Sequence, residues 1–143
     1  MDELTAWAGM PAAGRPENLV LTEEELCSLA DGKLVDVGAH TAHHPVLSSL
    51  TPSAQQEEIL QGKHQLEGIL GRPVVSFSYP YGGRQHYTAE TVKLVRQSGF
   101  SCACSNFPAV VQRGTDRYQL PRFLVRDWDG DEFARRLQKW FRG

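Results

Sequence analysis

The chain has 143 residues, of which 41% are hydrophobic and 22% charged, and its formal net charge is -2. This balance excludes a disordered chain and lacks the basic surface typical of nucleic-acid binders. No apolar run approaches the roughly 20 residues of a membrane-spanning helix, and the acidic start Met1-Asp2-Glu3 is unlike a signal peptide. We therefore expect a cytoplasmic protein as encoded, with neither nucleic acid nor membrane as a partner.

The chain has an odd number of cysteines, Cys27, Cys102 and Cys104, which argues against a disulfide framework. Cys102 and Cys104 are too close in sequence for the usual C-x-x-C zinc knuckle. Their place in an alternating apolar run after Phe100 predicts small side chains on a strand.

Helices and strands are predicted to alternate from Thr22 onward. Thr22 and Glu25 form a capping box for a helix to about Ala30, with Gly32 expected as a left-handed C-cap. A strand over residues 34–37 then runs toward the first histidines.

A long helix is predicted to begin at Thr51-Pro52 and to end at Gly71, because proline is favoured in the first helical turn and glycine just past the last. A strand over residues 74–78 follows. The expected buried stripe of the helix is Ile59, Leu66 and Leu70.

The second half of the chain predicts a helix over residues 88–98, with Val92 and Val95 inward, and strands over 100–104 and 120–125. Asp129 and Glu132 then cap a last helix. Its apolar face is Phe133, Leu137, Trp140 and Phe141.

Strands separated by helices imply a largely parallel sheet, so the predicted class is α/β. In such folds functional residues gather at the carboxyl ends of the strands. Two unusual loops, residues 40–45 and 79–83, are predicted to lie there.

The strongest chemical signal is the density of histidines in residues 40–44. In a helical turn the rings of His40 and His44 would lie on one face, within reach of one zinc-like ion, with Thr41 suited to orienting a ring nitrogen. Against this, clustered histidines in a surface loop can be merely polar, and Pro45 disfavours a helical backbone at His44. Two histidines also do not complete a three-ligand catalytic site.

The segment from Gly38 to Leu47, GAHTAHHPVL, resembles the H-[ST]-x-x-H-P-x-L motif of polysaccharide deacetylases of the nodulation-protein type, which are related to chitin and peptidoglycan deacetylases. The segment from Phe77 to Gly82 resembles the next motif of that family, and the resemblance extends over about residues 21–125. It implies a partial (β/α) barrel-like parallel sheet with flanking helices. It also implies that His40 and His44 bind a divalent metal, which is usually zinc in that family.

The same resemblance implies metal-dependent hydrolysis of N-acetyl groups from an N-acetylated carbohydrate. The Tyr81 backbone N–H would stabilise the oxyanion, and Pro80 and Trp128 would contact the substrate. The Asp127-Trp128-Asp129 stretch is only weakly similar to the fourth motif of the family. A helix cap preceded by a packing tryptophan explains it equally well.

The chain also departs from the family pattern. The T-F-D-D motif, which supplies the base and the third metal ligand, is absent: the aspartates before His40 are Asp2, Asp31 and Asp36. Many members have arginine where Ser78 stands, and the late leucine-x-histidine motif has no clear match. We therefore expect weak or no hydrolysis. The alternative is a non-catalytic, self-associating module that binds metal or sugar.

Residues 1–20 are interpreted as the remnant of an upstream insertion or an N-terminal arm, and residues 21–143 as a truncated domain. Truncation would leave an open sheet edge and expose apolar side chains. Self-association would bury both against a second chain. The side chains expected to be uncovered are Val35, Val37, Val75 and Phe77. A homodimer is the simplest outcome, although residues 4–21 could cover the edge instead.

Overall fold

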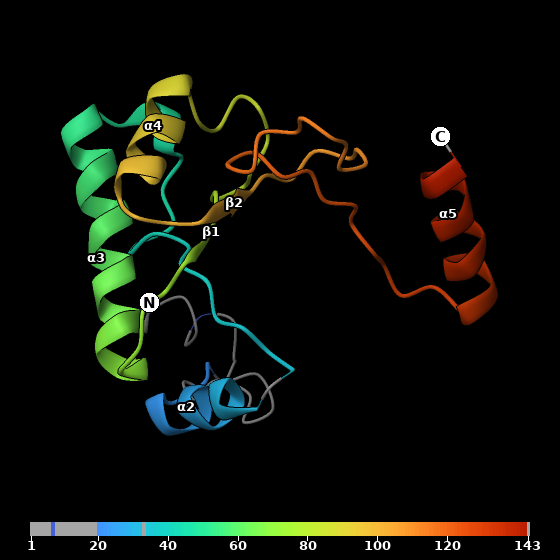
Figure 1. Ribbon diagram of the computed structural model, residues 1–143. Coiled ribbons are helices and arrows are strands. Elements are labelled where there is room, and N and C mark those ends of the chain that lie inside the picture. Colours follow the sequence, from blue (N-terminus) through green and yellow to red (C-terminus); the bar gives the residue numbers. More distant parts are fainter. Residues whose placement is uncertain (1–6, 8–19, 33, 143) are drawn as a thin grey trace. The chain divides into compact units, whose positions relative to one another are not determined.

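The computed structural model describes residues 7, 20–32 and 34–142. The chain divides into two compact units, residues 1–35 and 36–143, and each unit is described by itself. The division predicted between residues 20 and 21 stays a prediction, because most of residues 1–20 lie outside the described residues. Figure 1 shows the elements in chain order.

The first unit contains α2, Glu23–Asp31. The predicted capping box is confirmed: the Thr22 hydroxyl accepts the Glu25 N–H at 3.2 Å, and the Glu25 carboxylate accepts the Thr22 N–H at 2.8 Å. The predicted left-handed C-cap is wrong, because Gly32 has φ -68° and an extended backbone. The chain therefore leaves this helix without the usual glycine reversal.

The longest helix of the second unit is α3, Pro52–Leu70, with Thr51 as its N-cap. Gly71, at φ 63°, ends it in the left-handed conformation, as predicted. Ile59 is fully buried, while Leu66 and Leu70 are partly buried against the core. The short 3-10 helix η2, Leu47–Ser49, precedes α3.

The next helix, α4, spans Ala89–Gln97 and begins with a capping box between Thr88 and Thr91. It packs against α3 (Figure 1). The Thr91 hydroxyl donates to the Gln55 side-chain oxygen at 2.6 Å, and both residues are buried. Val92 and Val95 are buried, as predicted from the spacing.

The sheet is parallel. Strand β1, Ser76–Ser78, pairs with β2, Cys102–Cys104, with Phe77 opposite Ala103. Parallel bridges also join Ala39 to Phe77 and Cys104 to Leu120. Four chain segments are thus aligned in one direction, which confirms the predicted parallel arrangement.

Two predicted strands are not formed as expected. Residues 34–37 are described and form no ladder pair with any other described segment, and the only bridge nearby is at Ala39, beyond the predicted strand. Of residues 120–125, Leu120 alone is paired among the described residues. Leu34 is 99% exposed. A β-branched or apolar sequence does not make a strand by itself, because the ladder requires a backbone partner on the adjacent segment.

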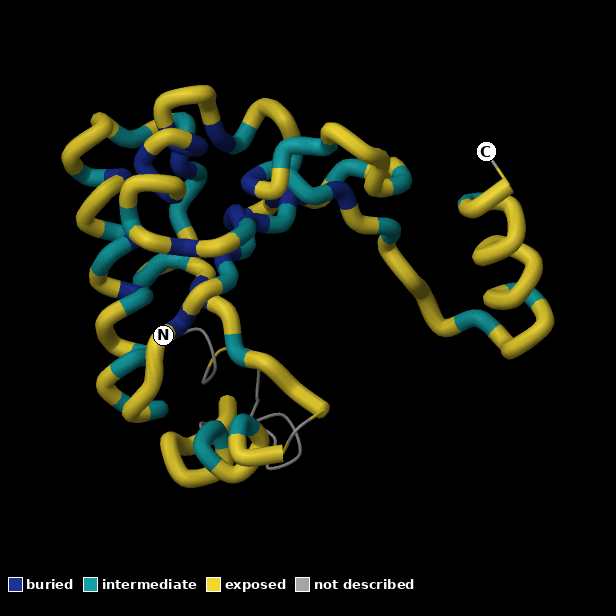
Figure 2. Tube along the Cα trace, viewed as in Figure 1, coloured by how far each residue is buried: buried dark blue, intermediate teal, exposed yellow. Residues whose placement is uncertain are grey.

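The core lies between the sheet and helices α3 and α4. Helices α2 and α5 have no fully buried residue, and Figure 2 shows most of each helix exposed. Phe77 is only 2% exposed and packs against Tyr79 and Phe100, with ring centroids 5.3 and 5.2 Å away. The expectation that Phe77 would be uncovered is therefore wrong. Val35 and Val75, by contrast, are 41% and 42% exposed.

The last helix, α5, spans Gly130–Arg142, as predicted. The Asp129 carboxylate accepts the Glu132 N–H at 2.7 Å, which caps the helix. Trp140 stacks on Phe123 at 4.2 Å, whereas Phe141 on the apolar face is 72% exposed. No helix among the described residues combines the length and apolar character needed to cross a bilayer.

Candidate functional site

The candidate site follows from the parallel sheet. His40 comes directly after the bridged residue Ala39, Tyr79 after β1, and Ser105 after β2. Arg122 follows the bridged residue Leu120 by two positions. Because parallel strands end at the same edge, these residues gather there.

The His40 ring is fixed by the backbone of β1. Its Nδ1 lies 2.7 Å from the Ser78 carbonyl oxygen, and the side chain is exposed. A carbonyl oxygen only accepts hydrogen bonds, so Nδ1 must carry the proton. The Nε2 lone pair of the neutral ring is then free to bind a metal, the arrangement common for ligating histidines.

The His44 ring lies beside that of His40, with centroids 4.7 Å apart, and 4.8 Å from the Tyr81 ring. Thr41 and His44 both have positive φ, 65° and 58°, so the loop is not the helical turn that the spacing suggested. This turn nevertheless brings the two rings together. Both are exposed and accessible to an ion.

Thr41 acts on the backbone of the loop instead of on a ring nitrogen. Its hydroxyl donates to the His40 carbonyl oxygen at 2.5 Å and accepts the His44 N–H at 3.1 Å. The group that orients the His40 ring is the Ser78 carbonyl, which sequence inspection did not single out.

His43 points to helix α3. Its Nδ1 donates to the Glu58 carboxylate at 2.8 Å. Burial alone would raise the pKa of Glu58, but hydrogen bonds and charge interaction with His43, together with the Ala42 N–H, outweigh it and leave the pKa below its usual value. Glu58 is therefore a carboxylate anchored to the histidine loop.

The two imidazoles suit a zinc ion, which prefers nitrogen and sulfur donors. Within the described ranges, however, no group of three or more histidine, cysteine or acidic side chains is arranged to hold a metal. Asp36 lies 3.6 Å from Arg72 in an ion pair, and Asp31 belongs to the first unit. Asp2 lies outside the described residues. The donor set here is thus two histidines.

The Tyr81 loop has a strained turn. The Gly82 N–H donates to the Pro80 carbonyl at 2.6 Å, and Tyr81 between them has φ 60°, which non-glycine residues rarely adopt. Asn106 holds the loop through its N–H to the Gly82 oxygen and its side-chain amide to the Tyr81 oxygen. No acceptor for the Tyr81 N–H is found in the described part of the chain. Pro80 is fully buried in the chain, and its contact with substrate stays a prediction.

Arg122 is the site residue that sequence reasoning missed. Its Nε donates to the Ser105 oxygen at 2.7 Å, and its Nη2 donates to the Ser78 hydroxyl at 3.0 Å. A guanidinium therefore stands beside Ser78, although the two residues lie far apart in the chain. The Gln-Leu-Pro-Arg sequence at the start of the strand predicted over residues 120–125 was the available signal.

Trp128 contacts the last helix. The Arg136 guanidinium lies 4.2 Å from its ring centroid, and the Trp140 ring lies 6.1 Å away. These contacts fit the packing interpretation of this tryptophan, and contact with substrate stays a prediction.

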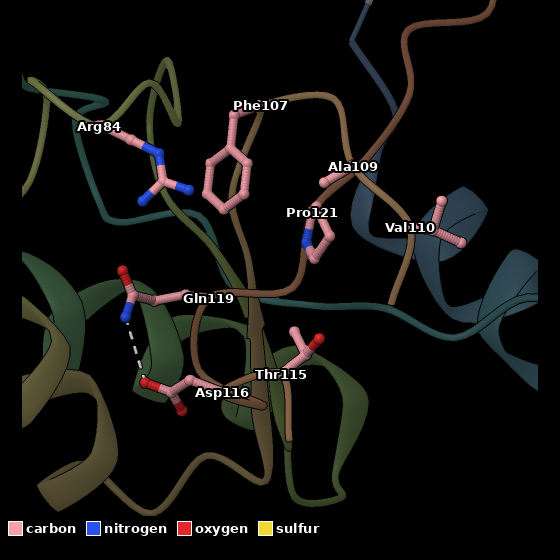
Figure 3. Close-up of a pocket in the computed structure, with 8 residues that line it drawn as sticks. All are labelled: Arg84, Phe107, Ala109, Val110, Thr115, Asp116, Gln119 and Pro121. Carbon is pink, nitrogen blue, oxygen red and sulfur yellow. Dashed lines mark hydrogen bonds between the residues drawn. The ribbon is translucent and has the colours of Figure 1, made fainter. Parts of the chain in front are cut away.

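A pocket of about 260 Å³ lies beside the loops that follow Tyr81 and β2 (Figure 3). On one side the Arg84 guanidinium lies 4.0 Å from the Phe107 ring centroid. On the other, the Gln119 amide donates to Asp116 at 3.2 Å. The hydrogen bond from the Tyr118 N–H, the one from the Gln119 side-chain amide and the charge of Arg96 together hold the pKa of Asp116 below its usual value.

Comparison with known proteins identifies relatives of this chain. Residues 7–103 match the polysaccharide deacetylase family model. YxkH of Bacillus subtilis (strain 168), a protein classed as a polysaccharide deacetylase, is 30% identical over 105 residues, which are 73% of this chain and 36% of that protein.

Solved structures share the fold. The Streptococcus pyogenes deacetylase PplD, in complex with acetate, has a TM-score of 0.74 at 16% identity over 84% of this chain and 52% of its own. The polysaccharide deacetylase BC0361 of Bacillus cereus has a TM-score of 0.72 at 22% identity over 84% and 37%. This chain therefore spans about a third to a half of the length of these relatives. The family match covers more than half of the chain, and the chain belongs to the polysaccharide deacetylase family.

Proposed function

We propose that this chain carries the zinc-binding and oxyanion-stabilising part of a site that removes acetyl groups from an N-acetylated carbohydrate. The observation that carries the proposal is the His40 Nδ1 contact with the Ser78 carbonyl, because it leaves Nε2 available beside the His44 ring. Family membership supports the reaction type.

The residues divide the task. His40 and His44 would hold the metal, which when bound polarises the acetamide carbonyl and activates water. The Tyr81 N–H would donate to the oxygen that gains negative charge as the amide is attacked. The exposed rings of His40, His44 and Tyr81 lie together, which places the loop that carries the Tyr81 N–H beside the two histidines that would hold the metal. The products are an amine and acetate.

Many family members have an arginine at the position of Ser78. In this chain the positive charge at that place comes from Arg122 instead. Its guanidinium reaches the Ser78 hydroxyl from a different segment of the sheet. We assign it the same task, which is to orient a carboxylate base that a group beyond the described residues would supply. Two hydrogen bonds fix its position, so little reorganisation would be needed on substrate binding.

The proposed activity of the chain by itself is weak. The described residues offer no third ligand with His40 and His44, and the Glu58 carboxylate at this loop already accepts three hydrogen bonds from Ala42 and His43. Loss of a general base typically slows such reactions about 10²- to 10⁴-fold. Acetate release from chitin oligosaccharides by the zinc-loaded chain tests this. Release that is abolished by His44→Ala and unaffected by His64→Ala supports the proposal, and release unaffected by His44→Ala rules it out.

A second candidate is a non-catalytic, self-associating module that binds metal or sugar. The two-histidine donor set and the exposed apolar side chain of Val75 favour it. Zinc or oligosaccharide binding with no acetate release would select this candidate over the first.

A further inference from the structure

We propose that Glu58 and Gly62, one turn apart on α3, form the platform that positions the histidine loop, residues 40–44. The platform is a positioning device for the His40 and His44 rings and is not itself part of the donor set. This inference rests on the proposed metal site.

Glu58 bonds to the middle of the loop at several points. Its carboxylate accepts the Ala42 N–H at 3.2 Å, the His43 N–H at 2.9 Å and the His43 Nδ1–H at 2.8 Å. Its main-chain oxygen also lies 3.1 Å from the Ala42 nitrogen. The anchored residues lie between His40 and His44, so a shift of this anchor would move both rings.

Gly62 lets the helix approach the same loop. A Cβ added there would lie 2.6 Å from both the carbonyl carbon and oxygen of Thr41, and 3.0 Å from the Ala42 nitrogen. These are backbone atoms that cannot rotate away. Residues four apart lie on one face of a helix, so Glu58 and Gly62 form one continuous surface against Thr41 and Ala42.

The loop needs such an external support. Thr41 and His44 have φ values that residues with side chains rarely adopt. A local turn of this kind persists only where its surroundings enforce it. Here the Glu58 carboxylate supplies the acceptors for two consecutive loop N–H groups and turns His43 away from the other two rings.

The carboxylate is also occupied. Three donors from Ala42 and His43 use its oxygens, so Glu58 serves the site by holding the loop. Glu58 is therefore not the third metal ligand that the site lacks. A ligand would approach the His40 and His44 rings, whereas Glu58 contacts the residues between them.

The test compares Glu58→Gln with Glu57→Gln, which changes an exposed neighbour on the same helix. Zinc affinity is measured by calorimetric titration, and exchange of the Ala42 and His43 amides is measured in metal-free protein. We expect Glu58→Gln to weaken zinc binding about tenfold, as for other groups that orient metal ligands. The two loop amides should exchange faster, and Glu57→Gln should match the parent chain.

Glycine variants give an independent check. Gly62→Ala should weaken zinc binding, because Thr41 and Ala42 must shift to admit the methyl group. Gly68→Ala is the matched control, since a Cβ there has open space within 4 Å. It should leave zinc affinity unchanged.

The outcomes separate the two proposals. If the parent chain binds no zinc, the proposed function fails, and faster exchange confined to the loop amides of Glu58→Gln would still support the platform. Unchanged zinc affinity and unchanged loop exchange in Glu58→Gln would overturn the platform. So would faster exchange throughout the chain, including the Tyr79 N–H that bonds to Cys104, because Glu58 would then support the fold in general.

Discussion

The His40 imidazole and the Ser78 carbonyl are joined at 2.7 Å, which ties the first candidate metal ligand to the end of β1. This contact selects the tautomer with the proton on Nδ1. A backbone acceptor also cannot be removed by changing one side chain. The ring is therefore held in its orientation before any metal binds, which lowers the ordering cost of ion binding.

Replacement of either candidate ligand should abolish tight zinc binding. We expect His40→Ala and His44→Ala each to weaken zinc affinity by more than the about 10- to 100-fold typical of groups that only orient ligands. His64→Ala, on the exposed side of α3, is the control and should bind as the parent does. Calorimetric titration measures all three. Parent-like affinity of both ligand variants would place the metal elsewhere.

The helices could be predicted because their signals are local. Thr22, Thr51 and Thr88 each cap the helix that follows them, and Gly71 ends α3 as expected. Strand lengths could not be predicted in the same way. Residues 120–125 are apolar enough for a strand, but pairing depends on a distant partner, and only Leu120 finds one.

The proximity of the His40 and His44 rings was predictable from the sequence, whereas the groups that hold their loop and the neighbouring strand end were not. His40 and His44 are close in sequence, so their spacing suggested a shared ion. Glu58 and Arg122 act on residues 15 and 44 positions away, respectively. No periodicity in the sequence shows that a helix carboxylate will meet loop N–H groups, or that an arginine will meet Ser78.

Phe77 and Val75 should differ strongly in their contribution to stability. Phe77→Ala removes a buried ring between Tyr79 and Phe100 and should lower the free energy of unfolding by about 3–5 kcal/mol. Val75→Ala, at a partly exposed position, should cost less than about 1 kcal/mol. Urea unfolding of both variants measures the difference. Equal losses would contradict the burial of Phe77.

The Asp116 carboxylate should make stability depend on pH. Its pKa in the folded chain lies below the unfolded value of about 3.9, chiefly through the Tyr118 N–H bond. Its stabilisation is thus fully present above that unfolded value and is lost as the pH falls through the folded pKa. At neutral pH, Asp116→Asn should lose up to about 1 kcal/mol, because the group is partly exposed.

Urea midpoints of the parent and Asp116→Asn, measured between neutral and strongly acidic pH, check this sign. The difference between the two proteins should shrink as the pH falls. Glu57→Gln serves as the control for loss of an exposed carboxylate. A difference that grows toward acid would show that Asp116 is not stabilised as an anion in the folded chain.

The chain should self-associate through apolar side chains that stay exposed near the paired segments. Val75, Leu124 and Val125 are large apolar side chains that remain at least two-fifths exposed. The segment before Ala39 also has no ladder partner among the described residues, so its backbone groups can pair with another chain. Identical chains that meet at one surface form a two-fold dimer most simply, because each copy then covers the same patch on the other.

Sedimentation velocity at micromolar concentration should therefore give a dimer that dissociates on dilution. Val75→Lys should shift the chain toward monomer, since a buried ammonium without a partner opposes association. Lys93→Glu is a control for a change of charge on α4, at an exposed position with no role in the sheet. It should leave the dimer intact. A parent chain that stays monomeric at every concentration would show that the exposed apolar side chains of the sheet are tolerated in water.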